Sequence, residues 1–353
     1  MRNSAFPAVR RSVLCALSCA VLSAALPAAS AAAPPRPGEA ARVPFAPRYE
    51  AEQHGGIVRT ANTSAKGLKG TESVNDDSSI TYVDVDSDPN TYNSSRAELP
   101  VPSGARVSWA RLYWGGNLRV GEQKPPADNG RVLIAEPGGR YKALLADTLI
   151  GHRTADGADA FQASADVTEL VRSSRSGQWT VAQVNVAMGR SKVGGWGGWT
   201  LVAAYEKASE PLRRLAVWDG FETVGPGAGE LRVPVDGNRY PKGTGGRLGV
   251  IAYDGDRGTS GDYLAVETSS SKSVRMADSA NSSDDVMNSS ISEFGTGRTV
   301  RHPDGTNTLG YDSDVFDLRG AMREGADRVH VRFGSRKDTV WLGALFLQAD
   351  VRR

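Results

Sequence analysis

Aspartates on a glycine-bent stretch have the residue types and the spacing that could hold a divalent cation. Asp254 and Asp256 flank a glycine, and Asp262 follows shortly after the apolar segment 248–253. Hard carboxylate oxygens on such a loop suit calcium. The stretch does not match the EF-hand pattern, however, and Asp-Gly pairs also make ordinary turns in which the side chain binds its own backbone. A calcium site and a plain turn are both open interpretations of this loop.

A second group of aspartates alternates with other residues. Asp84, Asp86 and Asp88 are separated by Val85 and Ser87. In a strand, all three carboxylates would project from one face and repel one another unless a cation lay between them. The alternative is a solvated, charged strand edge, which is the commoner use of such residues. We treat the three aspartates as a second candidate calcium site, against that alternative.

Two tryptophans could bind a ligand directly. Trp114 and Trp196 are each followed or preceded by glycines, which would let a sugar ring approach an exposed indole. Tryptophan more often fills a protein core, and Trp199 is expected to do so because it begins an apolar segment. We therefore predict Trp196 as the stronger ligand-binding residue and Trp114 as the second.

Catalytic motifs are missing from the sequence. It contains no H-E-x-x-H and no G-x-S-x-G, and its four histidines are far apart. Two carboxylates could still hydrolyse a glycosidic bond. The acids that could form such a pair are Asp254, Asp256, Asp262, Asp312 and Asp314.

The elements that would carry these residues are short strands. Apolar and polar residues alternate over 231–235 and 329–333, as in strands with one buried face. Segments 199–205 and 341–347 are apolar on both alternations and too short for core helices, so we predict central strands covered on both faces. Turn residues recur about every ten positions, which is typical of a sandwich or barrel.

Two parts of the sequence show the same order of segments. Residues 165–170 and 313–318 each precede a polar turn that ends in glycine, then a strand, a loop and one of the doubly apolar segments. Asp166 and Asp314 are predicted N-caps of a single helical turn. Either the two halves are a true duplication, or two β halves of one composition look alike.

These patterns predict the fold class and the domains. We expect an all-β, antiparallel β-sandwich of two jelly-roll-like lobes, residues 56–222 and 223–353, preceded by a flexible, proline-rich spacer over 34–55.

Residues 1–33 have the features of a secretory signal peptide. The first eleven residues contain three arginines and no acid, and an apolar run follows them. Small residues after this run allow cleavage after Ala31 or Ala33. A retained membrane anchor is the alternative, but Pro27 interrupts the run. Whether export uses the general or the twin-arginine route stays open. We expect an extracellular, secreted protein.

The mature chain has no cysteine, because Cys15 and Cys19 both lie in the predicted signal peptide. Disulfides and thiolate metal sites are therefore excluded. Loss of the three signal arginines takes the formal charge from +2 to −1. This charge suggests neither nucleic acid nor an anionic lipid as partner, and we expect no membrane insertion after signal cleavage.

Several stretches resemble a family of secreted and surface-anchored bacterial proteins whose members often precede DUF11-type repeats. The resemblance spans about residues 55–350 and rests on the following segments: 84–97, 110–116, 198–202, 211–213, 218–221 and 309–314. It implies a location and a β architecture, and it assigns no catalytic residue. The repeats and a second apolar span do not follow in this sequence, so we expect a freely secreted protein.

Together these observations favour a secreted, non-catalytic binding or structural module at the cell surface or in the medium, with an extracellular glycan or a cell-surface protein as partner. The alternative is a secreted hydrolase that acts on glycans or glycoproteins through paired carboxylates. Calcium is the one cofactor that the sequence suggests.

Overall fold

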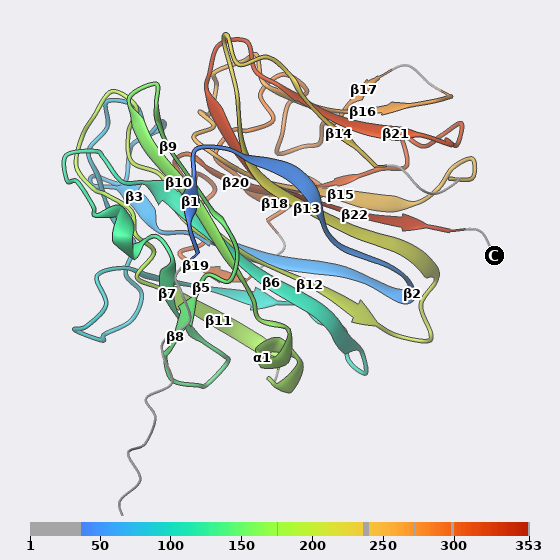
Figure 1. Ribbon diagram of the computed structural model, residues 1–353, viewed down its shortest axis with the longest axis horizontal. Helices are drawn as coiled ribbons and strands as arrows, with labels where there is room; N and C mark the ends of the chain where they lie inside the picture. Colours follow the sequence, from blue (N-terminus) through green and yellow to red (C-terminus); the bar gives the residue numbers. More distant parts are fainter. Residues whose placement is uncertain (1–36, 175, 236–239, 271–272, 298–299, 352–353) are drawn as a thin grey trace, which may run out of the picture. The chain divides into compact units, whose positions relative to one another are not determined.

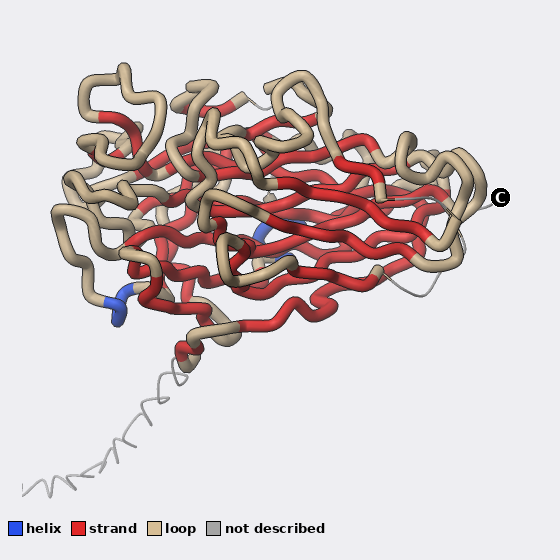
Figure 2. Tube along the Cα trace, turned by 90° about the horizontal axis from the view of Figure 1, so that it is seen from above, coloured by secondary structure: helices blue, strands red, loops and turns tan. Residues whose placement is uncertain are grey.

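β-Strands make up nearly all of the regular secondary structure in the described residues, which confirms the predicted all-β sandwich. The computed structural model describes residues 37–174, 176–235, 240–270, 273–297 and 300–351. The predicted signal peptide, residues 1–33, lies outside the described residues. Figure 2 shows how little helix there is: α1 (Thr168–Ser173) and the 3-10 turn η1 (Pro126–Asp128). No helix in the described ranges is long and apolar enough to cross a membrane.

One sheet of eleven strands forms the centre of the structure (Figure 1). In spatial order its strands are β1 (Glu39–Ala40), β9 (Ile150–Ala155), β10 (Ala158–Asp166), β6 (Arg106–Asn117), β12 (Gly197–Glu206), β2 (Val43–Thr63), β13 (Leu212–Val224), β22 (Val340–Asp350), β15 (Gly246–Tyr253), β20 (Tyr311–Asp317) and β18 (Ile291–Glu293). Nearly all neighbours are antiparallel; β1 with β9 and β18 with β20 are parallel.

Three smaller sheets accompany the large one. The five-stranded sheet contains β19 (Arg301–His302), β5 (Ser94–Leu99), β11 (Gly177–Ala182), β7 (Arg131–Ala135) and β8 (Lys142–Leu145). The four-stranded sheet contains β14 (Leu231–Pro234), β21 (Val329–Gly334), β16 (Tyr263–Thr268) and β17 (Val274–Arg275). A two-stranded ribbon pairs β3 (Ala65–Gly67) with β4 (Ile80–Tyr82).

The large sheet is symmetric in strand order about its β2–β13 pair. Outward from this pair the order is β12, β6, β10 on one side and β22, β15, β20 on the other. The same series of elements follows β10 in one half and β20 in the other. It consists of a turn, a strand of a small sheet, and a central strand that is buried on both faces. The strands β12 and β22 are buried along nearly their whole length, as their apolar sequences predict.

The register of this repeat differs from the predicted one by three residues. Asp166 Oδ1 accepts a hydrogen bond from the Thr168 N–H at 2.8 Å, and the equivalent bond joins Asp317 Oδ1 to the Arg319 N–H at 2.8 Å. The prediction that Asp314 is the second cap is wrong, because Asp314 lies inside β20 and is fully buried. Asp317, where the strand ends, is the residue equivalent to Asp166. The N-cap position of α1 itself is Val167, which makes no side-chain cap bond, so the prediction that Asp166 is the N-cap is one residue off.

The predicted flexible spacer is also wrong for much of its length. β2 begins at Val43, and its first part pairs with β13 from Val43 opposite Phe221 to His54 opposite Leu212. Its second part pairs with β12. The strand passes from one partner to the other at Gly55, where φ is 143° and any Cβ would lie 1.9 Å from the Tyr205 carbonyl oxygen.

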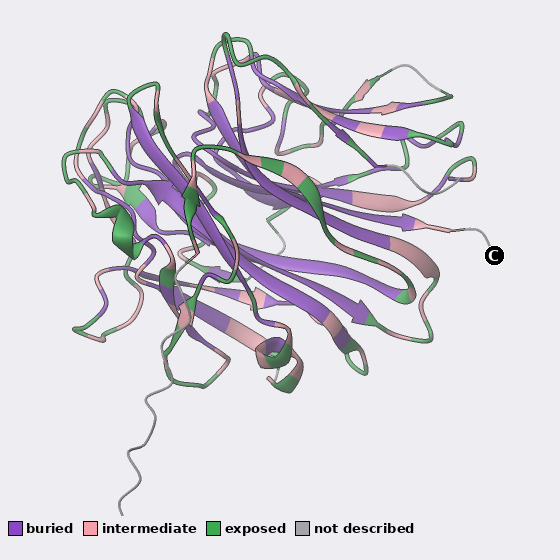
Figure 3. Cartoon of the chain, in the orientation of Figure 1, coloured by how far each residue is buried: buried purple, intermediate pink, exposed green. Residues whose placement is uncertain are grey.

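Most residues of the central strands are buried (Figure 3), and three apolar clusters fill the layers. The first joins β6 and β12 to the five-stranded sheet, and the second joins β13, β15 and β22 to the four-stranded sheet. The third lies on the other face of the large sheet and combines residues of both halves, such as Tyr113 and Val202 with Val217 and Phe346. The described residues accordingly form one compact unit. β13 spans the predicted boundary at residue 222 and contributes to the second and third clusters.

Candidate functional site

The predicted acidic loop begins where β15 ends. Asp254 takes a left-handed φ of 65°, and its N–H donates to the Gly310 carbonyl across 2.6 Å. Its Oδ1 accepts a hydrogen bond from Asn75 Nδ2 at 3.1 Å. Burial and the charges of neighbouring aspartates raise the pKa of Asp254 well above its usual range. A charged carboxylate is therefore unfavourable here unless a cation accompanies it.

Asp338, in the turn before β22, faces the same loop. The Asp256 N–H donates to Asp338 Oδ2 at 3.2 Å, and the Thr339 N–H donates to Asp338 Oδ1 at 2.8 Å. Burial, followed by the charge of Asp76, raises the pKa of Asp256 to about 7. Burial and the charge of Asp256 raise the pKa of Asp338 to about 7.

Asp262, the third residue of the predicted calcium loop, binds backbone instead. Its Oδ1 accepts hydrogen bonds from the N–H groups of Val286 and Met287, both at 2.7 Å. Burial raises its pKa to about 6. The Asp262 side chain thus holds the main chain of the loop that contains Val286 and Met287.

The structure brings two unpredicted residues to the acidic loop. Asn75 is 179 positions from Asp254, and Asp338 is 82 positions from Asp256. No local pattern connects such distant residues, so sequence reasoning missed both. In the part of the chain that the structure describes, no three Asp, Glu, His or Cys side chains already have the arrangement of a metal site.

Asp312 and Asp314, two of the acids considered for hydrolysis, are fully buried in β20. Asp312 Oδ1 accepts from the Ser290 N–H at 2.9 Å. Asp314 Oδ1 accepts from the Ser292 N–H at 2.8 Å and from the Ser292 hydroxyl at 2.7 Å. Burial raises the pKa of Asp314 to about 6, and burial with the charge of Asp314 raises that of Asp312 further. Neither carboxylate is accessible to a substrate.

Hydrogen bonds within the protein already engage each aspartate of the second candidate calcium site, and one of them is donated to Asp86 by the distant Tyr141 hydroxyl. Ser94 Oγ donates to Asp84 Oδ1 at 2.7 Å, the Asp88 N–H donates to Asp86 Oδ1 at 2.8 Å, and the Asn90 N–H donates to Asp88 Oδ1 at 2.9 Å. The segment is a loop and not a strand, so the three carboxylates are not forced onto one face. They do not converge on a common point of coordination.

The prediction that Trp196 and Trp114 form exposed ligand platforms is wrong, because both side chains are fully buried. Trp114 Nε1 donates to the Asn129 carbonyl at 2.9 Å, and the Trp196 ring packs 5.8 Å from that of Tyr253. The nearby glycines make room for this packing: a Cβ on Gly310 would lie 2.7 Å from the Trp196 Cβ.

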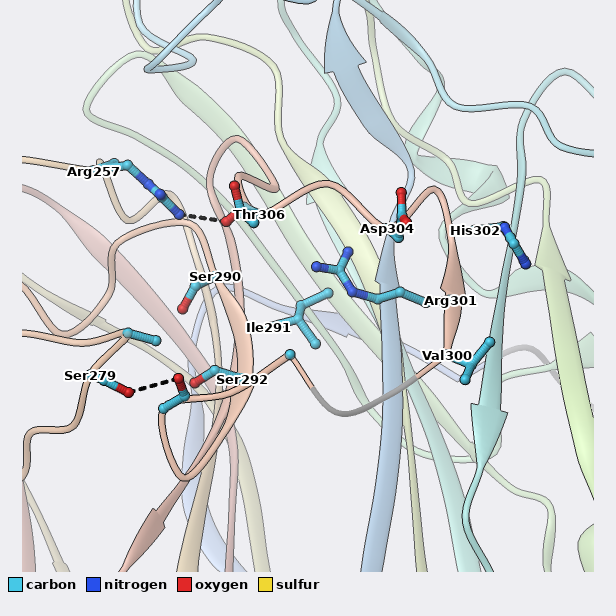
Figure 4. Close-up of a pocket in the computed structure, with 13 residues that line it drawn as sticks. Arg257, Ser279, Ser290, Ile291, Ser292, Val300, Arg301, His302, Asp304 and Thr306 are labelled. Atoms are coloured by element: carbon cyan, nitrogen blue, oxygen red, sulfur yellow. Dashed lines mark hydrogen bonds between the residues drawn. The ribbon is translucent and has the colours of Figure 1, made fainter.

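A polar groove of about 750 Å³ lies beside β18 and β19 (Figure 4). Its polar side chains are those of Arg257, Ser279, Ser290, Ser292, Arg301, His302, Asp304 and Thr306. They come from four separate segments, so no local sequence pattern indicates that they share a site. The large sheet contributes its edge strand β18, and β19 pairs with β5 of the five-stranded sheet.

Two arginines in the groove are held by backbone carbonyls. Arg257 Nη2 donates to the Thr306 carbonyl at 2.6 Å. Arg301 Nη1 donates weakly to the Pro303 carbonyl at 3.4 Å, and its Nη2 donates to that of Gly305. Burial and the charge of Arg59 lower the pKa of Arg301 to about 10, so it remains charged at neutral pH. Its guanidinium points into the groove (Figure 4).

Comparisons with known proteins leave the function open. No protein-family model matches the sequence, and no curated protein is similar to it. Two solved structures resemble the chain at 8% identity: an atomic structure of Sulfolobus Turreted Icosahedral Virus, with a TM-score of 0.22 over 83% of this chain and 90% of that chain, and the crystal structure of the STIV MCP, with a TM-score of 0.20 over 86% and 96%. At these scores neither likeness supports an argument about function.

Proposed function

We propose that this chain is a secreted, non-catalytic module that binds an extracellular glycan in the polar groove. The observation that carries the proposal is the lining of the groove, where hydroxyl, guanidinium, imidazole and carboxylate groups surround about 750 Å³. This volume is in the range of small-ligand sites. A sugar presents hydroxyls on several sides, and each needs a donor or an acceptor of this kind.

The absence of catalysis is proposed from the acids of the groove. Among its described lining residues, Asp304 is the one carboxylate, whereas glycoside hydrolysis uses two. Asp312 and Asp314 lie nearby in sequence but are fully buried. The hydrolase alternative therefore gains no support from the groove.

Export is proposed from the sequence of residues 1–33, with its arginines, apolar run and small residues before a cleavage point. Mass spectrometry of the protein recovered from culture medium tests it. A mature N-terminus at residue 32 or 34 would support secretion, and an intact precursor retained in the cytosol would refute it.

A glycan array with the purified mature chain tests the binding site. His302→Ala and Asp304→Ala change exposed groove side chains and are expected to weaken glycan binding by about tenfold or more, the value of one to two hydrogen bonds to charged or polar groups. Glu52→Ala, at an exposed position of β2 outside the groove, serves as the control. Unchanged affinity in both groove variants would show that the glycan binds elsewhere.

A further inference from the structure

The polar groove has more basic than acidic side chains. Arg257 and Arg301 are among its described lining residues, and Asp304 is the one carboxylate there. Arg301 is only 6% exposed, and Figure 4 shows that its guanidinium points into the groove. Asp304 is exposed, so water and salt screen its charge more than the charge of a buried group. The groove is therefore expected to have a positive electrostatic potential.

A third arginine lies behind the wall of the groove. Arg59 of β2 is 3% exposed, and its Nη2 donates to the carbonyl of Ser292, a lining residue. Its Nε and Nη1 have no hydrogen-bond partner in the part of the chain that the structure describes. Burial lowers the pKa of Arg59, and the charge of Arg59 adds to burial in lowering the pKa of Arg301. The two buried guanidinium groups thus lie near enough to repel each other.

None of the three arginines contacts a carboxylate of the described residues. Their nitrogens have no carboxylate oxygen of these residues within 4.0 Å. Arg257 donates to backbone carbonyls, and Arg301 donates to carbonyls and to one amide oxygen. Asp314 attracts Arg59 and Arg301 from a greater distance, and its Oδ1 already accepts bonds from Ser292. Buried positive charge without a contacting anion is unfavourable, and a ligand can supply the anion.

We propose that the ligand of the groove is an acidic glycan, and that a carboxylate or phosphate group of this glycan pairs with Arg301. The inference rests on the proposed function and specifies the class of glycan that the groove binds. A planar guanidinium can donate two parallel hydrogen bonds to a carboxylate or a phosphate. His302 and Asp304, the exposed polar residues beside Arg301 in the lining, stay available for the uncharged hydroxyls of the same ligand.

A glycan array that pairs each acidic glycan with a neutral form of the same backbone tests this inference. The pairs are uronic acid oligosaccharides with their methyl esters, and phosphorylated mannans with plain mannans. The charged member of at least one pair should bind about tenfold or more tightly than its neutral partner, the value of a charged hydrogen-bonded pair. The pair that shows the difference identifies the charged group as a carboxylate or a phosphate. Its affinity, measured by isothermal titration, should fall from about 50 to about 500 mM sodium chloride, because salt screens the charges.

Three variants assign the effect to the groove arginines. Arg301→Gln should lower the affinity for the charged glycan by about tenfold or more and the affinity for its neutral partner much less. Arg257→Gln, at an exposed lining position, should lower the affinity for the charged glycan by about two- to fivefold. Arg319→Gln, at an exposed position outside the groove, is the control and should leave both affinities unchanged. Thermal melting shows which variants are folded; if Arg301→Gln does not fold, Arg257→Gln and the salt dependence decide.

Two results would overturn the inference and leave the proposed function intact. The first is that neutral glycans bind as tightly as their charged partners. The second is that the folded arginine variants bind the charged glycan as tightly as the wild type. Absence of binding to every glycan on the array would overturn the proposed function together with this inference.

Discussion

The Tyr113 hydroxyl of β6 donates a hydrogen bond to Asp219 Oδ2 of β13 across 3.0 Å. Both residues are buried, and the bond joins the two halves of the large sheet at the cluster they share. The same carboxylate accepts two hydrogen bonds from Arg48 of β2, at 2.8 and 3.0 Å. Arg111 Nε lies 3.7 Å from it. One side chain thus holds three strands through charge and hydrogen bonds.

Asp219→Ala is expected to destabilise the fold by about 3–5 kcal/mol, because it leaves the buried Arg111 and the half-buried Arg48 without this partner. Tyr113→Phe is the matched variant, since it removes one hydrogen bond and keeps the ring; it should cost about 1–2 kcal/mol. Urea unfolding of both variants gives the free energies of unfolding. Equal losses would mean that the ion pairs at Asp219 contribute little.

Trp196→Ala tests the corrected role of this side chain. Because the indole is fully buried, its removal should cost about 3–5 kcal/mol in free energy of unfolding. Trp196→Phe, which keeps part of the volume, should cost less. Neither variant should change glycan affinity at a temperature where it is folded. A folded Trp196→Ala variant of wild-type stability would contradict the burial.

Strands with a strong hydrophobic pattern could be predicted from the sequence. Segments 199–205 and 341–347 are apolar on both faces because each lies inside the large sheet between two apolar clusters. The N-terminal part of β2 could not be predicted in this way. Its residues are partly exposed and include two prolines, and it is held by pairing with β13, a partner that no local pattern reveals.

The sites were harder to predict for the same reason. Asp254 and Asp256 stand out as an Asp-Gly-Asp turn, whereas Asn75 and Asp338 have no local signature. Glycine-flanked Trp196 looked exposed, although its glycines mark close packing. Spacing in the chain identifies turns, and the partners of those turns depend on tertiary contacts.

The stability of the cation-free protein should fall as pH rises from about 4 to about 6. Burial raises the pKa values of Asp262 and Asp314 to about 6 in the folded state, so the native chain keeps protons that the unfolded chain releases near pH 4. Folding is then favoured at the lower pH, and the advantage disappears as pH passes the folded pKa. The loss should be on the order of a few kcal/mol.

Urea unfolding in chelator at pH 4, 5, 6 and 7 measures this dependence. Asp314→Asn is the comparison, because its amide oxygen can still accept the bonds from Ser292 while the titrating carboxyl is gone. Its free energy of unfolding should fall less steeply over the same range. If the free energies of unfolding of the wild type and of Asp314→Asn change equally between pH 4 and pH 6, Asp314 does not keep a proton in the folded state.

Truncation of β2 separates a flexible spacer from a structural strand. A mature chain that starts at Gly55 lacks the residues that pair with β13 from Val43 to His54. It also lacks the Arg48 pair to Asp219. Unpaired N–H and C=O groups would then lie along β13 in the middle of the large sheet, an arrangement that promotes aggregation.

We expect this truncated chain to melt more than about 10 °C below the wild type or to aggregate, since several kcal/mol of pairing and burial are lost. A chain that starts at Val43 is the control, because it keeps all of β2. Thermal melting and size-exclusion chromatography compare the two. If the chain that starts at Gly55 is monomeric and melts within a few degrees of the control, residues 43–54 act as a spacer and the β2–β13 pairing does not hold the two halves together.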